Sequence, residues 1–346
     1  MSPIRRNVRE MSAYIPGEQI HEPGWIKLNT NENPYGPSPA VAEFLRTFDP
    51  QTLRRYPDPD CSTLRRSISE RHNCRPNQVF VGNGSDEILA LCTRAFVEDN
   101  RTIAFFEPSY SLYAVLAAIR AVAIRPVSLG PDFSWRDPVV DDADLFFLTS
   151  PNAPTGMAYP RDRIEVFCRN FPGVVVVDEA YADFADTNCM DLALQLPNVL
   201  VLRTFSKAYA LAAIRCGYVI GAPELIAALF SIKDSYNVNA LTQGVALAAF
   251  EDRDHTRRAT ERIRHDRERL AEFLRGKGWT VYPSQTNFLW IKPCQLTAKQ
   301  LFTALREKRI LTRWFAGPAT GDYLRITIGT ETEINRLIEI LSVMPH

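Results

Sequence analysis

The segment GVVVVDEAY (173–181) places four consecutive valines before two acidic residues. A strand with one face in water alternates apolar and polar residues, whereas a strand covered on both faces of a parallel sheet is apolar throughout. The valine run therefore predicts a buried strand in a mostly parallel sheet. Similar apolar segments recur along the chain, at 79–82, 102–108, 121–127, 144–150, 198–205 and 216–222.

Helical patterns lie between several of these segments. SDEILALCTRAFV (85–97) and YSLYAVLAAIR (110–120) have the apolar spacing of helices with one buried face, and Ser85 suits a helix cap. Strands that alternate with helices predict an α/β domain, here with a mostly parallel sheet flanked by helices.

The chain divides into three predicted parts. Residues 1–40 are rich in Pro, Asn and Gly, as in NTNENPYGPSP (29–39), and we expect an extended N-terminal arm because residues before proline avoid the helical region. Residues 41–240 form the predicted large domain. Residues 241–346 combine strands and helices and predict a smaller α+β domain.

The bulk composition narrows the classes of partner. Lys and Arg number 40 against 40 Asp and Glu, so no net charge attracts nucleic acid or an anionic membrane. The seven cysteines form no CxxC pair, which disfavours structural zinc and disulfides and favours a reducing compartment. No apolar run has the length of a membrane span, and residues 1–14 lack the apolar core of a secretory signal. We expect a cytoplasmic protein with small-molecule partners.

Polar residues follow several of the predicted strands. They are Gly82–Ser85, Tyr110, Asn152, Asp178, Tyr181, Thr204, Ser206 and Lys207. Ligands of open α/β sheets bind outside the carboxyl ends of the strands. We therefore expect these residues to converge on one site, although they lie far apart in the sequence.

The turn GNGSDE (82–87) follows a strand and opens a helix. Small residues let backbone N–H groups approach an anion, and a helix N-terminus favours negative charge. A phosphate fits this turn, although an ordinary strand-to-helix turn has the same pattern. A dinucleotide fold is disfavoured because Glu87 occupies the last position of the GxGxxG pattern.

Asp178 ends the valine run, and a carboxylate buried there needs a partner. The partner could be a lysine or arginine, a metal ion or a protonated ring nitrogen. Metal binding is disfavoured because no histidine is near Asp178 in the sequence and DxxY is not a ligand spacing.

Lys207 lies in RTFSKAYALAAIRCG (203–217), close to Thr204, Ser206 and Arg215. Hydroxyls and an arginine can clamp a phosphate, and cationic neighbours lower the pKa of a lysine and make its amine nucleophilic. Taken alone, Lys207 is better explained as a solvated surface lysine, because a lone lysine in a loop is usually solvated. A phosphate cup, a carboxylate for a pyridinium nitrogen, a tyrosine for a phenolic oxygen, a stacking aromatic ring and a reactive amine together describe pyridoxal phosphate.

The motifs resemble those of fold type I pyridoxal phosphate-dependent aminotransferases, and more closely those of the histidinol-phosphate aminotransferase family. The resemblance covers nearly the whole chain in the family's order: KLNTNENPYGPSP, RYPDP, GNGSDE, EPSY, SPNAPTG, VVDEAY, RTFSKAYALAAIRCG, YNVNALTQ, SQTNFLWI and YLRITIGT.

The resemblance implies a role for each matching residue. Lys207 is similar to the lysine that forms a Schiff base with the cofactor, and Asp178 to the partner of the pyridine nitrogen. Tyr181 resembles the donor to the ring oxygen, and Tyr110 the residue that stacks on the ring. The implied ligands of the cofactor phosphate are Gly84, Ser85, Asp86, Thr204, Ser206 and Arg215.

Further residues are implied to bind substrate or to complete the dimer. Tyr56 resembles the tyrosine that family members supply to the neighbouring subunit, which implies a homodimer with a shared active site and an arm that packs with the small domain and the partner. Arg325 resembles the arginine that grips the anionic group of the substrate. Arg313 and Tyr14 resemble further ligands of the substrate phosphate, and Asn33 would lie close by.

Two positions depart from the family pattern. The asparagine that usually precedes Pro-Thr-Gly and bonds the ring oxygen is Ala153 here, and Asn152 stands one position earlier. Either Asn152 reaches the ring through a shifted backbone, or Tyr181 makes that hydrogen bond alone. A glycine usual near Arg215 is Ala213, which is tolerated where its φ is negative.

The implied reaction is transfer of the amino group of L-histidinol phosphate to 2-oxoglutarate, giving imidazole acetol phosphate and glutamate. Lys207 would take the substrate Cα proton and return it at the cofactor. An aromatic amino-acid aminotransferase is the main alternative, and a threonine-phosphate decarboxylase is a weaker one. A binding protein without turnover is disfavoured because Lys207 and Arg325 are both present.

Overall fold

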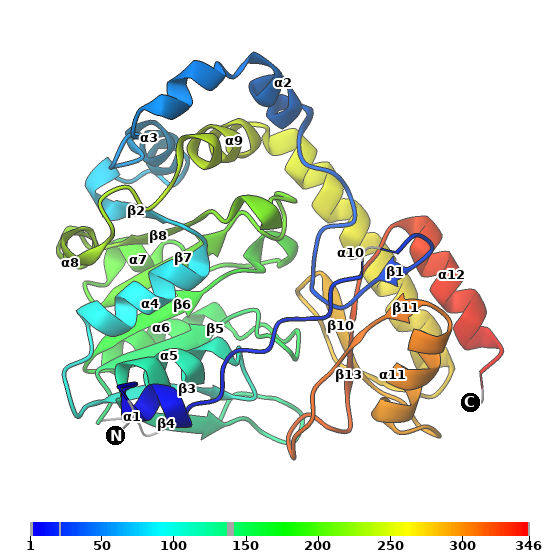
Figure 1. The fold of residues 1–346 in the computed structure, drawn as a ribbon. Coiled ribbons are helices and arrows are strands. Elements are labelled where there is room, and N and C mark those ends of the chain that lie inside the picture. The colour runs from blue at the N-terminus through cyan, green and yellow to red at the C-terminus, as the bar shows by residue number, and fades with distance from the viewer. Residues whose placement is uncertain (1–2, 21, 137–141, 345–346) are drawn as a thin grey trace.

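The computed structural model of the protein describes residues 3–20, 22–136 and 142–344. Its large domain is built on a seven-stranded sheet with the order β2-β8-β7-β6-β5-β3-β4 (Figure 1). The strands are β2 (Val79–Gly82), β3 (Thr102–Glu107), β4 (Ala123–Ser128), β5 (Leu145–Thr149), β6 (Val174–Asp178), β7 (Val199–Thr204) and β8 (Gly217–Gly221). All neighbouring pairs are parallel except those made by β8. The predicted mostly parallel sheet is confirmed.

Helices cover both faces of this sheet. They are α4 (Ser85–Ala95), α5 (Leu112–Arg120), α6 (Arg161–Asn170), α7 (Leu192–Gln195) and α8 (Pro223–Ile232). Val175 and Val177 of β6 pack into the hydrophobic core that includes α6 and α7, whereas Val176 packs into the core that includes α4, α5 and α8. The valine run is therefore buried on both sides, as its sequence predicts.

The small domain follows a 24-residue helix, α10 (Arg253–Gly276). Its antiparallel sheet has the order β12-β13-β10-β9 and lies to the right in Figure 1. Its elements are β9 (Thr280–Val281), β10 (Phe288–Lys292), α11 (Ala298–Glu307), β11 (Ile310–Leu311), β12 (Arg313–Trp314), β13 (Leu324–Thr327) and α12 (Glu331–Ser342). This mixed architecture agrees with the α+β fold expected for the C-terminal part.

The N-terminal arm crosses from one domain to the other. It begins with α1 (Arg6–Glu10), which packs on α5, and reaches β1 (Ile26–Lys27), which pairs with β11 of the small domain (Figure 1). Beyond the arm, α2 (Pro39–Thr47) and α3 (Ser62–Arg71) pack against α9 (Ala240–Glu251). The domain boundary expected at residue 240 coincides with the start of α9. The chain reaches the small sheet after α9, along α10, which contacts β9 and β10. Within the described residues, no helix is long and apolar enough to cross a membrane.

Candidate active site

The site lies at the carboxyl ends of the central strands. Asp178 is the last residue of β6, in register with Thr149 of β5 and Leu202 of β7. Lys207 follows β7 by three residues, and its Nζ lies 5.9 Å from the centre of the Tyr181 ring. Parallel strands end at one edge of a sheet, so residues distant in sequence meet there, as expected.

Lys207 is half-buried and lies among other cations. Burial lowers the pKa of its amine to about 8, helped by the positive charges of Arg325 and Arg215 and opposed by Asp86 and Glu32. Its Nζ donates a 3.3 Å hydrogen bond to the backbone carbonyl of Thr30 in the arm. A substantial fraction of this amine is therefore neutral and nucleophilic near physiological pH.

Asp178 is buried, with 3% of its surface exposed. Burial raises the pKa of its carboxyl to about 6, although hydrogen bonds from the Tyr113 hydroxyl (2.7 Å) and the Ala180 N–H (3.1 Å) favour the ionised form. A carboxylate held this way is suited to pair with a protonated ring nitrogen.

Tyr113 is a residue of this site that the sequence reasoning missed. Its fully buried hydroxyl also lies 2.6 Å from Thr149 Oγ1, so it joins two strand ends. One signal could have identified it: Tyr113 lies on the first turn of α5, one turn beyond Tyr110, on the buried side of the helix.

Two further tyrosines line the site. Tyr181 is buried, and its hydroxyl oxygen accepts a 2.8 Å hydrogen bond from Asn31 Nδ2 in the arm. The Tyr110 hydroxyl donates a 3.3 Å hydrogen bond to Asp86 at the start of α4. The Tyr110 ring lies edge-on to those of Tyr113 and Tyr14, at 5.7 and 5.9 Å.

The strand-to-helix turn forms a cradle that suits a phosphate. Gly84 has a φ of +85°, and a Cβ there would lie 2.7 Å from Arg215 Nη2. Ser85 is the first residue of α4 and not the cap that the sequence had suggested; the N-cap is Gly84, which has no side chain to bond the helix N–H groups. Free N–H groups, the helix dipole and an adjacent guanidinium are the donors that anions bind.

The lysine loop completes this cradle. Arg215 donates to Ser206 Oγ (3.2 Å) and to Asp86 Oδ2 (3.3 Å), and the Ser206 N–H donates to Thr204 Oγ1 (3.1 Å). The residues implied to hold the cofactor phosphate are therefore brought together. Ala213 lies in a short 3-10 helix (Ala212–Ile214), a conformation that alanine adopts readily.

Two arginines face the site from the small domain. Arg313 of β12 and Arg325 of β13 are directly opposite each other in the antiparallel register, and both guanidinium carbons lie 5.2 Å from the centre of the Phe315 ring. Arg325 Nη2 donates to the Asn29 carbonyl (2.9 Å), but its buried Nε has no hydrogen-bond partner among the residues described. Two opposed cations and a free donor favour an anionic ligand.

The arm covers these arginines. Arg313 donates to the carbonyls of Ile15 (2.9 Å) and Pro16 (3.3 Å), next to Tyr14. Asn33 Nδ2 donates to the Ala208 carbonyl (3.0 Å), so it fastens the arm to the lysine loop. Tyr14 and Asn33, which the resemblance implies to lie near the substrate, are therefore both next to the site.

In the described part of the chain, Asn152 and Tyr56 make no contact that points directly to the cofactor roles implied for them. Asn152 is fully buried, and its amide hydrogens are bonded to the Pro108 carbonyl (3.1 Å) and Thr155 Oγ1 (2.9 Å). Tyr56 is 81% exposed and stacks on Tyr236 with a distance of 4.4 Å between ring centres. A cofactor role for either residue stays a prediction.

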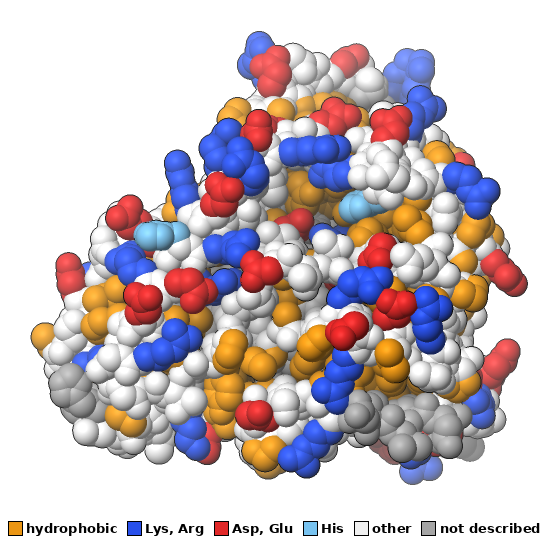
Figure 2. Space-filling view, turned by 180° about the vertical axis from the view of Figure 1, so that it is seen from behind, with side chains coloured by type: hydrophobic (Ala, Val, Ile, Leu, Met, Phe, Trp, Pro, Cys, Tyr) orange, Lys and Arg blue, Asp and Glu red, His pale blue; other side chains and the backbone are white. Residues whose placement is uncertain are grey.

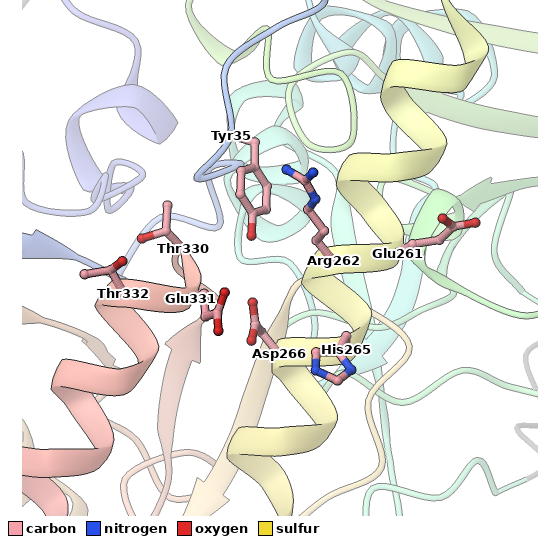
Figure 3. A pocket seen from close by; sticks show the side chains of 8 residues that line it. All are labelled: Tyr35, Glu261, Arg262, His265, Asp266, Thr330, Glu331 and Thr332. Carbon is pink, nitrogen blue, oxygen red and sulfur yellow. The ribbon is translucent and has the colours of Figure 1, made fainter.

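A separate pocket opens between α10 and the N-terminus of α12 (Figure 3). Its lining residues are Tyr35, Glu261, Arg262, His265, Asp266, Thr330, Glu331 and Thr332. None of them belongs to the site described above. Within the described ranges, no group of three or more His, Cys, Asp or Glu side chains is placed to hold a metal ion.

Comparisons with known proteins identify the family of this chain. The family described as aminotransferase class I and II matches residues 23–341. A histidinol-phosphate aminotransferase of Syntrophotalea carbinolica is 42% identical over 344 residues, which cover 99% of each chain. Another, of Chromohalobacter salexigens, is 44% identical over 97% of each chain.

Solved structures share the fold. A histidinol-phosphate aminotransferase of Sinorhizobium meliloti, determined in complex with pyridoxal 5′-phosphate, superposes with a TM-score of 0.87 over 99% of both chains, at 23% sequence identity. An L-threonine-O-3-phosphate decarboxylase of Porphyromonas gingivalis gives a TM-score of 0.78 at 22% identity, over 92% of this chain and 98% of that one. The two full-length relatives named above are histidinol-phosphate aminotransferases, and the chain belongs to the class I and II aminotransferase family.

Proposed function

We propose that this enzyme uses pyridoxal phosphate to move the amino group of L-histidinol phosphate to 2-oxoglutarate, giving imidazole acetol phosphate and glutamate. The observation that carries this proposal is the pair Arg313 and Arg325, opposed across neighbouring strands. Like charges placed opposite each other destabilise a sheet unless an anion neutralises them. A phosphate ester carries nearly two negative charges near neutral pH, enough for both guanidinium groups, whereas an aromatic amino acid offers them only its single α-carboxylate.

The residues present fit the cofactor. Lys207 would bond its aldehyde carbon, Asp178 would pair with its ring nitrogen, and Tyr181 would donate to its ring oxygen. The cradle formed by α4 and the lysine loop would hold its phosphate, and Tyr110 would cover the ring. When bound, pyridoxal phosphate supplies an electron sink that acidifies the substrate's Cα–H bond.

The chain's own groups then bind substrate and move the proton. The Lys207 amine, with a pKa near 8, would act as the base that takes the Cα proton and then as the acid that gives it back. Asp178 would keep the ring nitrogen protonated, because a buried ionised carboxylate is stabilised by an adjacent positive charge.

One anion site serves both half-reactions. Arg325 can bind a phosphate or a carboxylate through its planar fork, so it would accept histidinol phosphate first and 2-oxoglutarate second. Arg313 adds a second positive charge that favours the phosphate ester. Product leaves before the second substrate binds, which gives ping-pong kinetics.

We also propose a cytoplasmic homodimer whose active site takes Tyr56 from the partner subunit. The exposed stack of Tyr56 on Tyr236 supports this, since aromatic side chains are enriched at protein interfaces. Figure 2 shows acidic and basic side chains interspersed over one face, as the zero net charge suggests, which supports small-molecule partners rather than nucleic acid.

A single-turnover spectrum tests the substrate assignment. The cofactor-loaded enzyme is mixed with L-histidinol phosphate without a keto acid, and the absorbance of the bound cofactor is followed. Rapid conversion to the pyridoxamine form, with phenylalanine sluggish, supports the proposal. Fast conversion by phenylalanine alone assigns the enzyme to aromatic substrates, and release of carbon dioxide from O-phospho-L-threonine assigns it to decarboxylation.

A further inference from the structure

We propose that Asn31 is a positioning residue for Tyr181: its amide occupies the acceptor side of the phenol oxygen and so directs the phenol proton to the ring oxygen of the cofactor. The inference rests on the proposed cofactor, but not on the identity of the substrate. Asn31 lies in the arm, 150 residues before Tyr181, and no role for it follows from the sequence motifs.

The orientation of the Asn31 amide is set by its neighbours. The Thr327 hydroxyl donates to Asn31 Oδ1 (3.0 Å) and accepts from the Asn31 N–H (3.0 Å). Asn31 Oδ1 therefore faces Thr327, and Nδ2 is the atom that faces the Tyr181 hydroxyl at 2.8 Å. An amide nitrogen only donates, so it cannot take the phenol proton.

The backbone at Asn31 is equally well fixed. The residue is 1% exposed and has a φ of +57°, in the left-handed region that asparagine tolerates better than most residues. Asn287 Nδ2 donates to its carbonyl oxygen (3.0 Å). Small-domain residues therefore hold the amide against Tyr181.

The need for such positioning arises from Ala153, which replaces the usual donor to the ring oxygen. Both amide hydrogens of Asn152 are already bonded, one to the Pro108 carbonyl beyond the end of β3 and one to Thr155 Oγ1 in its own loop. Tyr181 is then the donor left for that oxygen. A phenol free to rotate would divide its proton among several acceptors, whereas one held by Asn31 presents it in one direction.

The same arm segment contacts other groups of the site. The carbonyl of Asn29 accepts from Arg325, that of Thr30 accepts from Lys207, and Thr327 lies two residues beyond Arg325 on β13. The strand that carries the substrate arginine therefore also holds the amide that orients Tyr181.

The test is a pH titration of the bound cofactor, read from its absorbance without substrate. A hydrogen bond donated to the ring oxygen stabilises negative charge there and lowers the pKa of the bound cofactor. We expect Asn31→Ala to raise that pKa by about half to one unit, in the same direction as Tyr181→Phe. The charged groups around Tyr181, namely Arg325, Asp178, Asp86 and Lys207, are unchanged in these variants.

The double variant Asn31→Ala/Tyr181→Phe separates positioning from a general effect on structure. If Asn31 acts through Tyr181, the double variant has the pKa of Tyr181→Phe alone. Additive shifts, or no shift in Asn31→Ala, would overturn the proposal. Asn29→Ala is the matched control, because Asn29 is buried in the same segment but its amide donates to the Glu18 carbonyl (2.8 Å).

Thr327 offers a second route if Asn31→Ala does not fold. Thr327→Val removes the hydroxyl that orients the Asn31 amide and should raise the pKa of the bound cofactor. Thr327→Ser keeps a hydroxyl there and should leave that pKa at the wild-type value. Equal pKa values in these two variants would contradict the inference. An enzyme that shows these shifts but does not convert histidinol phosphate would refute the substrate assignment alone.

Discussion

The Tyr113 hydroxyl donates a 2.7 Å hydrogen bond to Asp178 Oδ2 at the buried end of β6. This bond favours the ionised carboxylate and offsets part of the effect of burial on its pKa. In the proposed cofactor site that charge would hold the ring nitrogen, so Tyr113 would act on cofactor binding through Asp178.

Tyr113→Phe should therefore weaken cofactor binding. Loss of a hydrogen bond to a charged group costs about 1.5–3 kcal/mol, so we expect the dissociation constant of pyridoxal phosphate to rise about tenfold or more. Equilibrium titration of the apo-protein measures it. Tyr159→Phe is the matched control, since the buried Tyr159 hydroxyl has no partner in the part of the chain described. Equal affinities in the two variants would refute the role of Tyr113.

The raised pKa of Asp178 predicts how the apo-protein depends on pH. A carboxyl whose pKa is about 6 when folded, against a usual 3.8, adds stability that is complete below pH 3.8 and lost as pH rises through 6. The Asp178→Asn variant has no carboxyl at this position, so it does not lose this stability as pH rises. Between pH 4 and pH 8 the unfolding free energy of the apo-variant should rise relative to the wild type by roughly 2 kcal/mol.

Denaturant unfolding at several pH values measures this difference. With pyridoxal phosphate bound the sign should reverse at pH 8, because Asn cannot pair with a protonated ring nitrogen. A difference between variant and wild type that does not change with pH would show that Asp178 is not buried as a carboxylate.

Much of this site follows from the sequence because strand ends and helix starts are local features. Apolar runs locate Asp178 and Lys207, the strand-to-helix turn locates Ser85, and parallel pairing brings them to one edge. Tyr113 and Asn31 escaped prediction for a different reason. Each acts through a hydrogen bond to a residue 65 or 150 positions away, and no periodic pattern encodes such a contact.

Tyr56 shows a further limit of sequence reasoning. Its local sequence fits an exposed turn, and in the single chain it is exposed. Only the resemblance to the family suggested a place in a neighbouring site. The role proposed for Tyr56 depends on a second subunit, which neither periodicity nor packing within one chain describes.

Lys207 should react with pyridoxal phosphate as an amine of pKa about 8. Covalent trapping with borohydride should therefore become faster as pH rises, with a midpoint near 8. Arg325→Met removes a positive charge that lowers this pKa, so its midpoint should lie higher. A wild-type midpoint near 10.5 would mean that the amine is solvated as in an ordinary lysine.

Arg313 should discriminate between phosphorylated and aromatic substrates. Arg313→Gln should lower kcat/KM for histidinol phosphate by about tenfold to a hundredfold, the value of one or two charge-assisted hydrogen bonds. The value for phenylalanine should change much less. Arg313→Lys keeps the positive charge but loses the planar fork of donors. Its kcat/KM for histidinol phosphate should lie between the values of the wild type and Arg313→Gln. Equal losses for both substrates would mean that Arg313 serves the arm, through Ile15 and Pro16, rather than the phosphate.

A shared active site predicts complementation between two inactive variants. In a mixed dimer of Lys207→Ala and Tyr56→Ala subunits, one site carries both substitutions and the other carries neither. Refolding equal amounts together should yield mixed dimers as half of the population, and so about a quarter of wild-type activity. Each variant refolded alone is the control and should stay far less active. If the mixture has only the mean activity of the two variants, Tyr56 acts within its own chain or outside the active site, and its exposed stack on Tyr236 has another purpose.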